Sequence, residues 1–303
     1  MQHLKWNLNV RHMQFCGVLM LTSLIGACAP MPQKPVEPVV SEAQLIASGE
    51  ASERTGDYSH ALLDYIKAAT ANPRSANAHY HVAHLHTVLG NQSTAQEAFN
   101  RTLSINPKHI DALEGLGLLN LEQGQSADAT RLLKQALALD ARRWRSANGL
   151  GVLADLAGNH VQAQAYFSAG LKLSPTRPEL LNNIGYSYYL DGNLKASQDY
   201  FQRALSKAPE YKTAWSNLAL VRVRLGNYAG AVDAFSESLK PYQAYNNVGY
   251  LLYLNGDLDK ARDYLQRAIA LSPSYYTLAE DNLRRVEAVA QAHVLAPKTV
   301  QLN

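Results

Sequence analysis

Asparagine side chains recur through the second half of the chain at steps of 34, 30 or 64 residues, and tyrosines recur beside them at a step of 64. An asparagine side chain carries two donor hydrogens and an acceptor oxygen, so a row of them can pair with the backbone of an extended peptide. Tyrosine adds a large, rigid contact area with a polar tip. We therefore predict a peptide-binding groove. Its residues would be Asn148, Asn182, Asn183, Asn217, Asn246, Asn247, Tyr186, Tyr189, Tyr250 and Tyr253.

A structural explanation competes with this prediction. The sequence Asn-Asn-Ile/Val-Gly-Tyr occurs at residues 182–186 and again at 246–250. Duplication of one unit, followed by packing within its helix, would also produce that repetition.

Four histidines crowd one predicted helix, at His79, His81, His84 and His86. We expect His81 and His84 to face the groove and the other two to face the following helix. An i, i+3 histidine pair can ligate zinc. No cysteine or carboxylate follows in this helix, so we predict no metal and no cofactor. A polar or pH-sensitive contact is the simpler interpretation, and a metal-dependent periplasmic protein is the alternative of another class.

Motifs of catalysis do not occur in the sequence. It contains no HExxH, no GxSxG and no glycine-rich phosphate loop after a strand. We therefore predict a binding protein and not an enzyme.

The third chemical feature is Cys28, at the end of Ile25-Gly26-Ala27-Cys28. Lys5 and Arg11 precede an apolar stretch of eleven residues, 15–25, which would span roughly 16 Å as a helix and is too short for a membrane core of about 30 Å. This pattern indicates a signal peptide over 1–27, and an ordinary signal peptide with an incidental cysteine is the alternative.

The sequence around Cys28 resembles the box at which bacterial lipoproteins are cleaved and acylated. The resemblance implies that Cys28 is lipidated and anchors the mature protein to a membrane. Residues 28–41 contain four prolines and would form an extended linker. Ala29, in place of aspartate, implies the periplasmic face of the outer membrane of a Gram-negative bacterium.

Composition excludes several other classes of protein. Charged residues make up 17% of the 303 residues and hydrophobic ones 47%, which excludes a disordered chain and a multi-span membrane protein. Residues 1–27 hold two of the 28 basic residues and none of the 25 acidic ones, so the mature net charge is +1. This balance predicts no nucleic-acid partner. No particular oligomeric state is predicted.

The elements that position these residues follow a 34-residue glycine period. The glycines are Gly56, Gly90, Gly124, Gly158, Gly192 and Gly226, with Gly256 after a step of 30. With each glycine at position 15, the units are 42–75, 76–109, 110–143, 144–177, 178–211, 212–241 and 242–275. Positions 8, 20 and 27 are small, position 24 is large, and proline stands at position 32 of five units.

This pattern closely resembles the tetratricopeptide (TPR) repeat over residues 42–275. The resemblance implies an all-α superhelical solenoid of about seven helix-turn-helix units, with a protein partner on the concave face. We expect a capping helix at 274–295 and a tail at 296–303. Position 9 lacks the asparagine of carboxylate-clamp TPR domains, which favours capture of a peptide backbone.

Two units depart from the pattern. Ala141 replaces the expected proline before Trp144, which predicts that the helix runs on through this turn. Unit 212–241 is four residues short, which predicts a bend or a subdomain seam near residue 241.

Among lipoproteins with such repeats, the chain most resembles the TadD type of tight-adherence (Flp) pilus assembly. The signal, the number of units, the Asn-Asn-Ile/Val-Gly-Tyr helices, Tyr275-Tyr276 and Asn282-Leu283-Arg284-Arg285 carry this resemblance. It implies a role in targeting or assembling a secretin or a pilus-assembly subunit. An adaptor of peptidoglycan hydrolases, similar to NlpI-type lipoproteins, is the alternative.

Overall fold

The computed structural model describes residues 40–295. The predicted signal peptide 1–27, Cys28, all but the last two residues of the predicted linker and the predicted tail 296–303 lie outside these residues. Fifteen helices and no strand occur in residues 40–295. The helices are α1 Glu42–Arg54, α2 Tyr58–Ala71, α3 Ala76–Val88, α4 Gln92–Ile105, α5 Ile110–Glu122, α6 Ser126–Leu139, α7 Trp144–Leu156, α8 His160–Leu173, α9 Pro178–Leu190, α10 Leu194–Lys207, α11 Lys212–Arg224, α12 Tyr228–Ser236, α13 Pro241–Leu254, α14 Leu258–Leu271 and α15 Thr277–Leu295.

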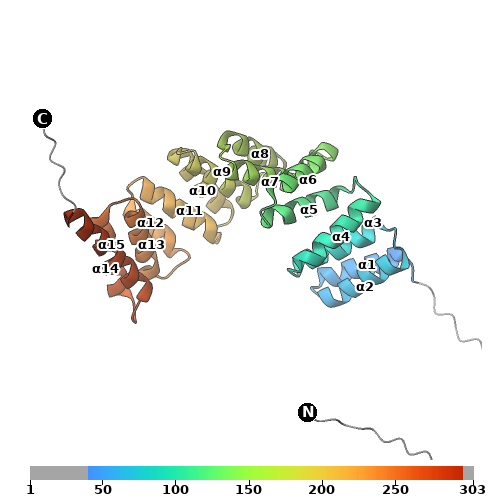
Figure 1. Cartoon of the computed structure of the whole chain (residues 1–303), viewed down its shortest axis with the longest axis horizontal. Helices are drawn as coiled ribbons and strands as arrows, with labels where there is room; N and C mark the ends of the chain where they lie inside the picture. The colour runs from blue at the N-terminus through green and yellow to red at the C-terminus, as the bar shows by residue number, and fades with distance from the viewer. Residues whose placement is uncertain (1–39, 296–303) are drawn as a thin grey trace, which may run out of the picture. The chain divides into compact units, whose positions relative to one another are not determined.

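The helices form antiparallel pairs that follow one another in chain order, as Figure 1 shows. All seven predicted turn glycines have a φ between 74° and 82°, a conformation that costs a side-chain-bearing residue about 1 kcal/mol or more. Asp57 shows how the next helix begins, since its Oδ1 accepts a hydrogen bond from the backbone N–H of His60 at 3.1 Å. Glycine at the turn and a polar N-cap therefore set the turn between the two helices of a pair.

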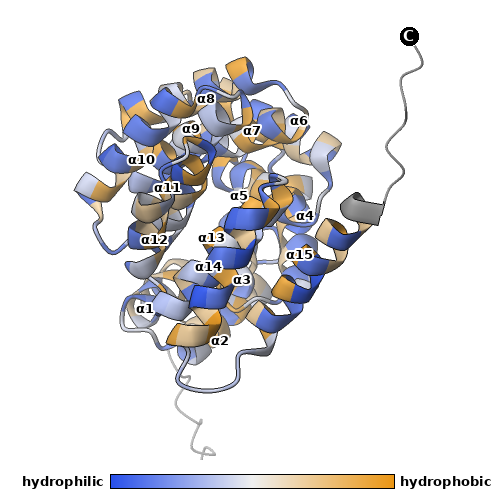
Figure 2. Cartoon of the chain, turned by 90° about the vertical axis from the view of Figure 1, so that its left-hand side faces the viewer, coloured by the Kyte–Doolittle hydropathy of each residue, from blue (hydrophilic) through white to orange (hydrophobic). Residues whose placement is uncertain are grey.

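Within each pair, a small residue on the first helix receives a large one from the second. A Cβ atom on Gly151 of α7 would lie 2.4 Å from the ring of Phe167 on α8. Phe167 is 1% exposed, and burying such a ring contributes about 1.5–3 kcal/mol. Figure 2 shows apolar and polar residues on each helix, as this one-sided packing requires.

The odd-numbered helices form the inner face of the array. Each odd-numbered helix from α1 to α13 contacts the next odd-numbered one, and within residues 40–295 no even-numbered helix contacts the next even-numbered one. The array therefore curves with the odd-numbered helices on its inner side. This confirms the all-α TPR solenoid predicted from the sequence.

The predicted continuous helix before Trp144 is wrong. Helix α6 ends at Leu139, and Asp140 adopts an extended conformation with a φ of −145°. The Asp140 carboxylate accepts a hydrogen bond from the backbone N–H of Arg142 at 3.0 Å. This aspartate turn ends the helix without a proline.

The short unit has a short second helix, since α12 has nine residues where the other second helices have fourteen. One cluster of buried side chains nevertheless runs from Leu181 to Val286, across Pro241. Within the described residues there is therefore no subdomain seam at this point, and the bend stays a prediction.

Helix α15 packs against α13 and α14, with Ala279 and Val286 fully buried. It occupies the place of an eighth inner helix. No helix of residues 40–295 is both long and apolar enough to cross a membrane.

Candidate functional site

The predicted asparagines lie on the inner helices, where they bond to one another. Asn183 Nδ2 on α9 donates to Asn148 Oδ1 on α7 at 2.8 Å. Asn217 Nδ2 on α11 donates to Asn182 Oδ1 on α9 at 2.9 Å. Asn182 Nδ2 donates to Asn183 Oδ1 at 3.3 Å. These three bonds connect α7, α9 and α11 in one chain of amides.

A second amide chain connects α13 to α15. Asn282 Nδ2 donates to Asn246 Oδ1 at 3.0 Å, and Asn246 Nδ2 donates to Asn247 Oδ1 at 3.3 Å. Asn282 was not among the predicted site residues. The sequence contained one signal for this contact: Asn282 follows Asn246 by 36 residues, close to the 35 residues that the other two bonds between helices span. We call the two chains together the asparagine ladder.

The ladder is interrupted between α11 and α13. In the two bonds that connect α7, α9 and α11, an asparagine at position 5 of one helix accepts from an asparagine at position 6 of the next. Asn247 holds position 6 on α13, but Ser216 holds position 5 on α11. The Ser216 side chain has no amide oxygen to accept the bond, so the ladder is interrupted at the short unit 212–241.

The ladder divides the predicted asparagines into two groups. Asn182 and Asn246 are 4% and 2% exposed, so they serve contacts between helices. Asn148, Asn183, Asn217 and Asn247 are half-buried. An asparagine amide has two N–H groups, and each bond within the ladder uses one of them. The half-buried group therefore retains hydrogen-bonding capacity toward the inner surface.

The four predicted tyrosines form two ring pairs beside the ladder. The rings of Tyr186 and Tyr189 stack with centroids 6.0 Å apart, and those of Tyr250 and Tyr253 lie 6.2 Å apart. The Arg224 guanidinium lies 5.5 Å from the centre of the Tyr189 ring. Each pair presents a flat aromatic surface on the inner side.

A cavity of about 360 Å³ opens beside Asn183 and Tyr186. Its other lining residues are Val152, Asp155, Leu156, Phe167 and Leu190. The predicted residues thus border a mostly apolar hollow that has polar groups at its edge, which is the usual composition of a binding pocket.

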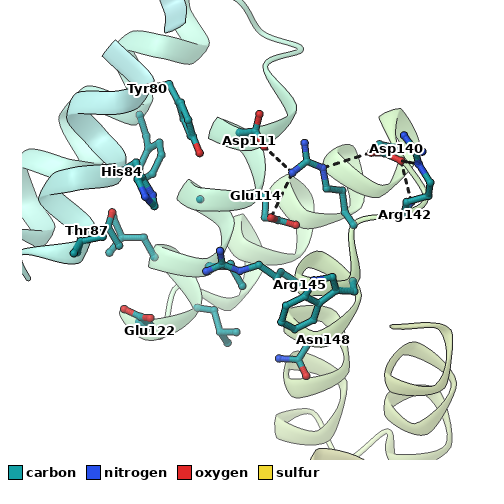
Figure 3. A pocket seen from close by; sticks show the side chains of 18 residues that line it. Tyr80, His84, Thr87, Asp111, Glu114, Glu122, Asp140, Arg142, Arg145 and Asn148 are labelled. Atoms are coloured by element: carbon teal, nitrogen blue, oxygen red, sulfur yellow. Dashed lines mark hydrogen bonds and ion pairs between the residues drawn. The ribbon is translucent and has the colours of Figure 1, made fainter. Parts of the chain in front are cut away.

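A larger cavity, of about 850 Å³, lies among α3, α5 and α7, and we call it the α5 cavity (Figure 3). No pattern in the sequence predicted this cavity. Its floor includes Phe99, Leu118 and Leu119, and its rim carries charged side chains. Gly115 stands at position 6 of α5, where α9, α11 and α13 carry asparagine, so no side chain projects into the cavity from this position.

Arg143 gathers three of the carboxylates around the α5 cavity. Its Nη1 lies 2.6 Å from Asp111 Oδ1 and 3.7 Å from Glu114 Oε1, and its Nε lies 3.6 Å from Asp140 Oδ2. Burial opposes the positive charge of Arg143, but the hydrogen bond and charge of Asp111 outweigh it and raise the pKa of Arg143. Arg143 therefore stays charged and offsets part of the negative charge of these three carboxylates, and Arg142 pairs with Asp140 as well.

Two other groups in the α5 cavity make no hydrogen bond or ion pair within residues 40–295, the Tyr80 hydroxyl and the Arg145 guanidinium. Burial, with the charge of Asp111 adding to it, raises the pKa of Tyr80 to about 12. Tyr80 is therefore a neutral hydrogen-bond donor at ordinary pH. Arg145 is an exposed cation on α7.

His81 and His84 contact side chains of the preceding pair. His84 Nε2 lies 3.1 Å from Glu53 Oε1, and His84 lines the α5 cavity. The His81 ring stacks on Tyr65 at 4.7 Å and is mostly covered, so it faces the neighbouring pair more than the groove. Within the described residues no group of three or more His, Cys, Asp or Glu side chains could hold a metal ion.

Ser187, Asp155 and His160 come together, but not as a catalytic triad. Ser187 Oγ donates to Asp155 Oδ1 at 2.8 Å, and His160 Nδ1 meets the same oxygen at 2.9 Å. A triad needs the histidine between the serine and the carboxylate. Ser187 is also fully buried, so the group is a structural contact between units.

Comparison with known proteins agrees with the geometry. Models of the family described as "Tetratricopeptide repeat" match residues 114–178, 182–243 and 242–275, about half of the chain. The first two helix pairs precede the matched ranges and have the same pairing. No curated protein matches the sequence.

Several solved structures share the fold at low identity. A tetratricopeptide repeat protein from Parabacteroides merdae ATCC 43184 has a TM-score of 0.58 and 18% identity, over 81% of this chain and 98% of that one. The APC/C hetero-tetramer Cut9-Hcn1 gives 0.60 and 20%, over 83% of this chain and 49% of that one. Pseudomonas aeruginosa pilF gives 0.54 and 19%, over 71% and 97%.

Proposed function

We propose that this chain, which belongs to the tetratricopeptide-repeat family, is an adaptor that holds an extended segment of another envelope protein against its inner face. Repeats of this family are typically non-catalytic scaffolds for protein–protein interaction. The observation that carries the proposal is the inner face from α7 to α13. There, half-buried asparagines with remaining hydrogen-bonding capacity lie beside two tyrosine pairs and an apolar cavity.

The ladder gives this surface its rigidity. Bonds between asparagines fix the spacing of α7, α9 and α11, so the remaining amide groups are held in place before a partner arrives. Binding to a preorganised surface loses less conformational entropy. An extended backbone offers N–H and C=O groups at regular intervals, which matches a row of amides.

We propose further that the partner belongs to tight-adherence or type IV-like pilus assembly, a secretin or a pilus-assembly subunit. The resemblance of the N-terminal segment and of the asparagine-containing helices to TadD-type lipoproteins supports this assignment. The similarity to pilF is compatible with it, although at 19% identity that similarity concerns the fold. Lipidation of Cys28 and placement on the outer membrane belong to the same proposal.

Identification of the partner tests the assignment. The full chain would be crosslinked in envelopes of its own cells, purified, and the captured proteins identified by mass spectrometry. Recovery of a secretin or a pilus-assembly subunit is expected. Recovery of murein hydrolases would overturn the pilus assignment in favour of a cell-wall adaptor on the same fold.

The same capture, repeated with inner-face variants, tests the surface. Tyr186→Ala and Tyr250→Ala together remove contact area without touching the ladder, and should abolish capture. Tyr58→Ala, on the outer helix α2, is the matched control and should leave capture unchanged.

A further inference from the structure

The α5 cavity differs in chemistry from the asparagine-lined part of the inner face. At position 6, α5 has Gly115 where α9, α11 and α13 have asparagine. The ring of Phe99 fills the space beneath it, since a Cβ atom on Gly115 would lie 2.5 Å from that ring. The floor of the cavity is closely packed, since Phe99 and Leu119 are 2% and 1% exposed. The apolar side chains of the cavity that a partner can reach are the exposed Val88 and the half-buried Leu118 and Leu121.

The volume of the cavity fits a bulky side chain and its neighbours. At about 850 Å³ it lies within the range of small-ligand pockets, about 300–1,000 Å³. No other side chain of residues 40–295 fills it. A large apolar group entering from a partner would be buried against valine and leucine side chains.

Donor groups converge above this floor. Figure 3 shows Arg145 extending from α7 toward the space between α3 and α5, with Tyr80 and His84 on the opposite wall. The Tyr80 hydroxyl, the Arg145 guanidinium and the Asn148 amide N–H groups have no acceptor within the described residues. The ligand that satisfies such a set is a hydrogen-bond acceptor, and the cation favours a negatively charged one.

The carboxylates of the cavity differ in how strongly they would repel a bound anion. Asp111, Glu114 and Asp140 all face Arg143, and Glu114 Oε2 also accepts from Ser146 Oγ at 2.7 Å. Glu122 makes no such contact. It lies at the end of α5 away from Asp111 and is exposed (Figure 3). An anionic group of a partner is therefore expected to bind at Arg145, which makes no ion pair within residues 40–295.

We propose that the α5 cavity binds an acidic side chain of the partner at Arg145, with an adjacent bulky apolar side chain of the same segment against Val88, Leu118 and Leu121. The inference rests on the proposed function and deepens it. Asn148 lines the cavity and also begins the ladder, so one extended segment can occupy both. An internal acidic residue is specified because position 9 lacks the asparagine with which carboxylate-clamp TPR domains bind a chain terminus.

Selection from a displayed peptide library tests this specificity. Short random peptides, displayed with both ends blocked so that only side-chain carboxylates are available, would be selected on the full chain in detergent. Enriched sequences should place aspartate or glutamate within a few residues of a large apolar residue. The fluorescein-labelled form of the most enriched peptide then serves as the probe for binding by fluorescence anisotropy.

Variants connect the peptide to the cavity. Arg145→Ala should weaken binding of the probe about tenfold or more, as expected for loss of a charged hydrogen bond. Val88→Trp, at an exposed residue of the cavity wall, should block binding while the circular dichroism stays helical. Arg131→Ala, an exposed arginine on the outer helix α6, should change nothing.

The outcomes separate this inference from the proposed function. Enriched peptides with basic residues, weakened by Glu122→Gln, would overturn the inference. Binding that survives Arg145→Ala and Val88→Trp but is lost in Tyr186→Ala/Tyr250→Ala would also overturn it, and would leave the groove adaptor standing. No enriched peptide, or binding unaffected by either set, would count against both.

Discussion

At the scale of single residues, the same side chains support both the fold and the surface. Asn182 is buried and bonded on both sides, whereas Asn183, its neighbour, keeps part of its amide at the inner surface. The sequence could predict that both residues lie on one helix face from their spacing. It could not separate them, because burial depends on how closely α7, α9 and α11 approach.

His81 gives a residue-scale prediction about pH. Burial lowers its pKa from 6.5, and the charges of Glu50 and Glu53 only partly offset this effect. His84 and His109 also face it, and burial lowers the pKa of His109 as well. A histidine with a lowered pKa binds protons more readily when unfolded, so stability should be present above pH 6.5 and decline as pH falls below it.

The test compares thermal melting of the wild type and His81→Phe between pH 7.5 and pH 5. Phenylalanine keeps the stacking on Tyr65 but cannot be protonated. The fall in melting temperature on acidification should therefore be smaller in the variant. An equal fall in both proteins would show that His81 does not contribute.

At the scale of elements, glycine and proline predicted most turns, and the exception is instructive. The turn before Trp144 was predicted as helix because no proline precedes it, yet the Asp140 side chain forms the turn by accepting from Arg142 N. The α5 cavity was not predicted either, because it depends on how side chains of different helix pairs pack together. It depends on Gly115 being small at one position while the floor comes from Phe99 on another pair.

The interruption of the ladder at Ser216 predicts a stabilising substitution. Ser216→Asn places an acceptor amide where Asn247 Nδ2 can donate to it, as in the three other bonds between helices. The expected gain is about 0.5–1.5 kcal/mol. It should appear as roughly a fivefold slower amide hydrogen exchange in α13. Ser216→Ala, the control, should show no slowing, and equal exchange in both variants would contradict the ladder rule.

At the scale of the whole molecule, the 34-residue period predicted the repeat architecture, and both the structure and the family match confirm it. Periodicity succeeds here because each pair contacts mainly its neighbours, so local pattern determines the array. A partner leaves no comparable period in the sequence, and for that reason its identity stays a proposal.

Membrane attachment is a prediction at this scale. Cys28→Ser removes the proposed acylation site and should move the protein from the membrane pellet to the soluble periplasmic fraction. Two or more acyl chains give stable anchoring, so the wild type should remain in the pellet after a salt wash. A variant that still pellets would show that Cys28 is not the anchor.

The central claim is that a partner binds the inner face, and site-specific photocrosslinking tests it most directly. A photoreactive amino acid would replace Tyr186 or Tyr250 on the inner face, or Lys134 on the outer helix α6, in living cells. We expect both inner sites, and not Lys134, to crosslink one envelope protein, a secretin or a pilus-assembly subunit. Crosslinks only from Lys134, or none from the inner sites, would contradict the account.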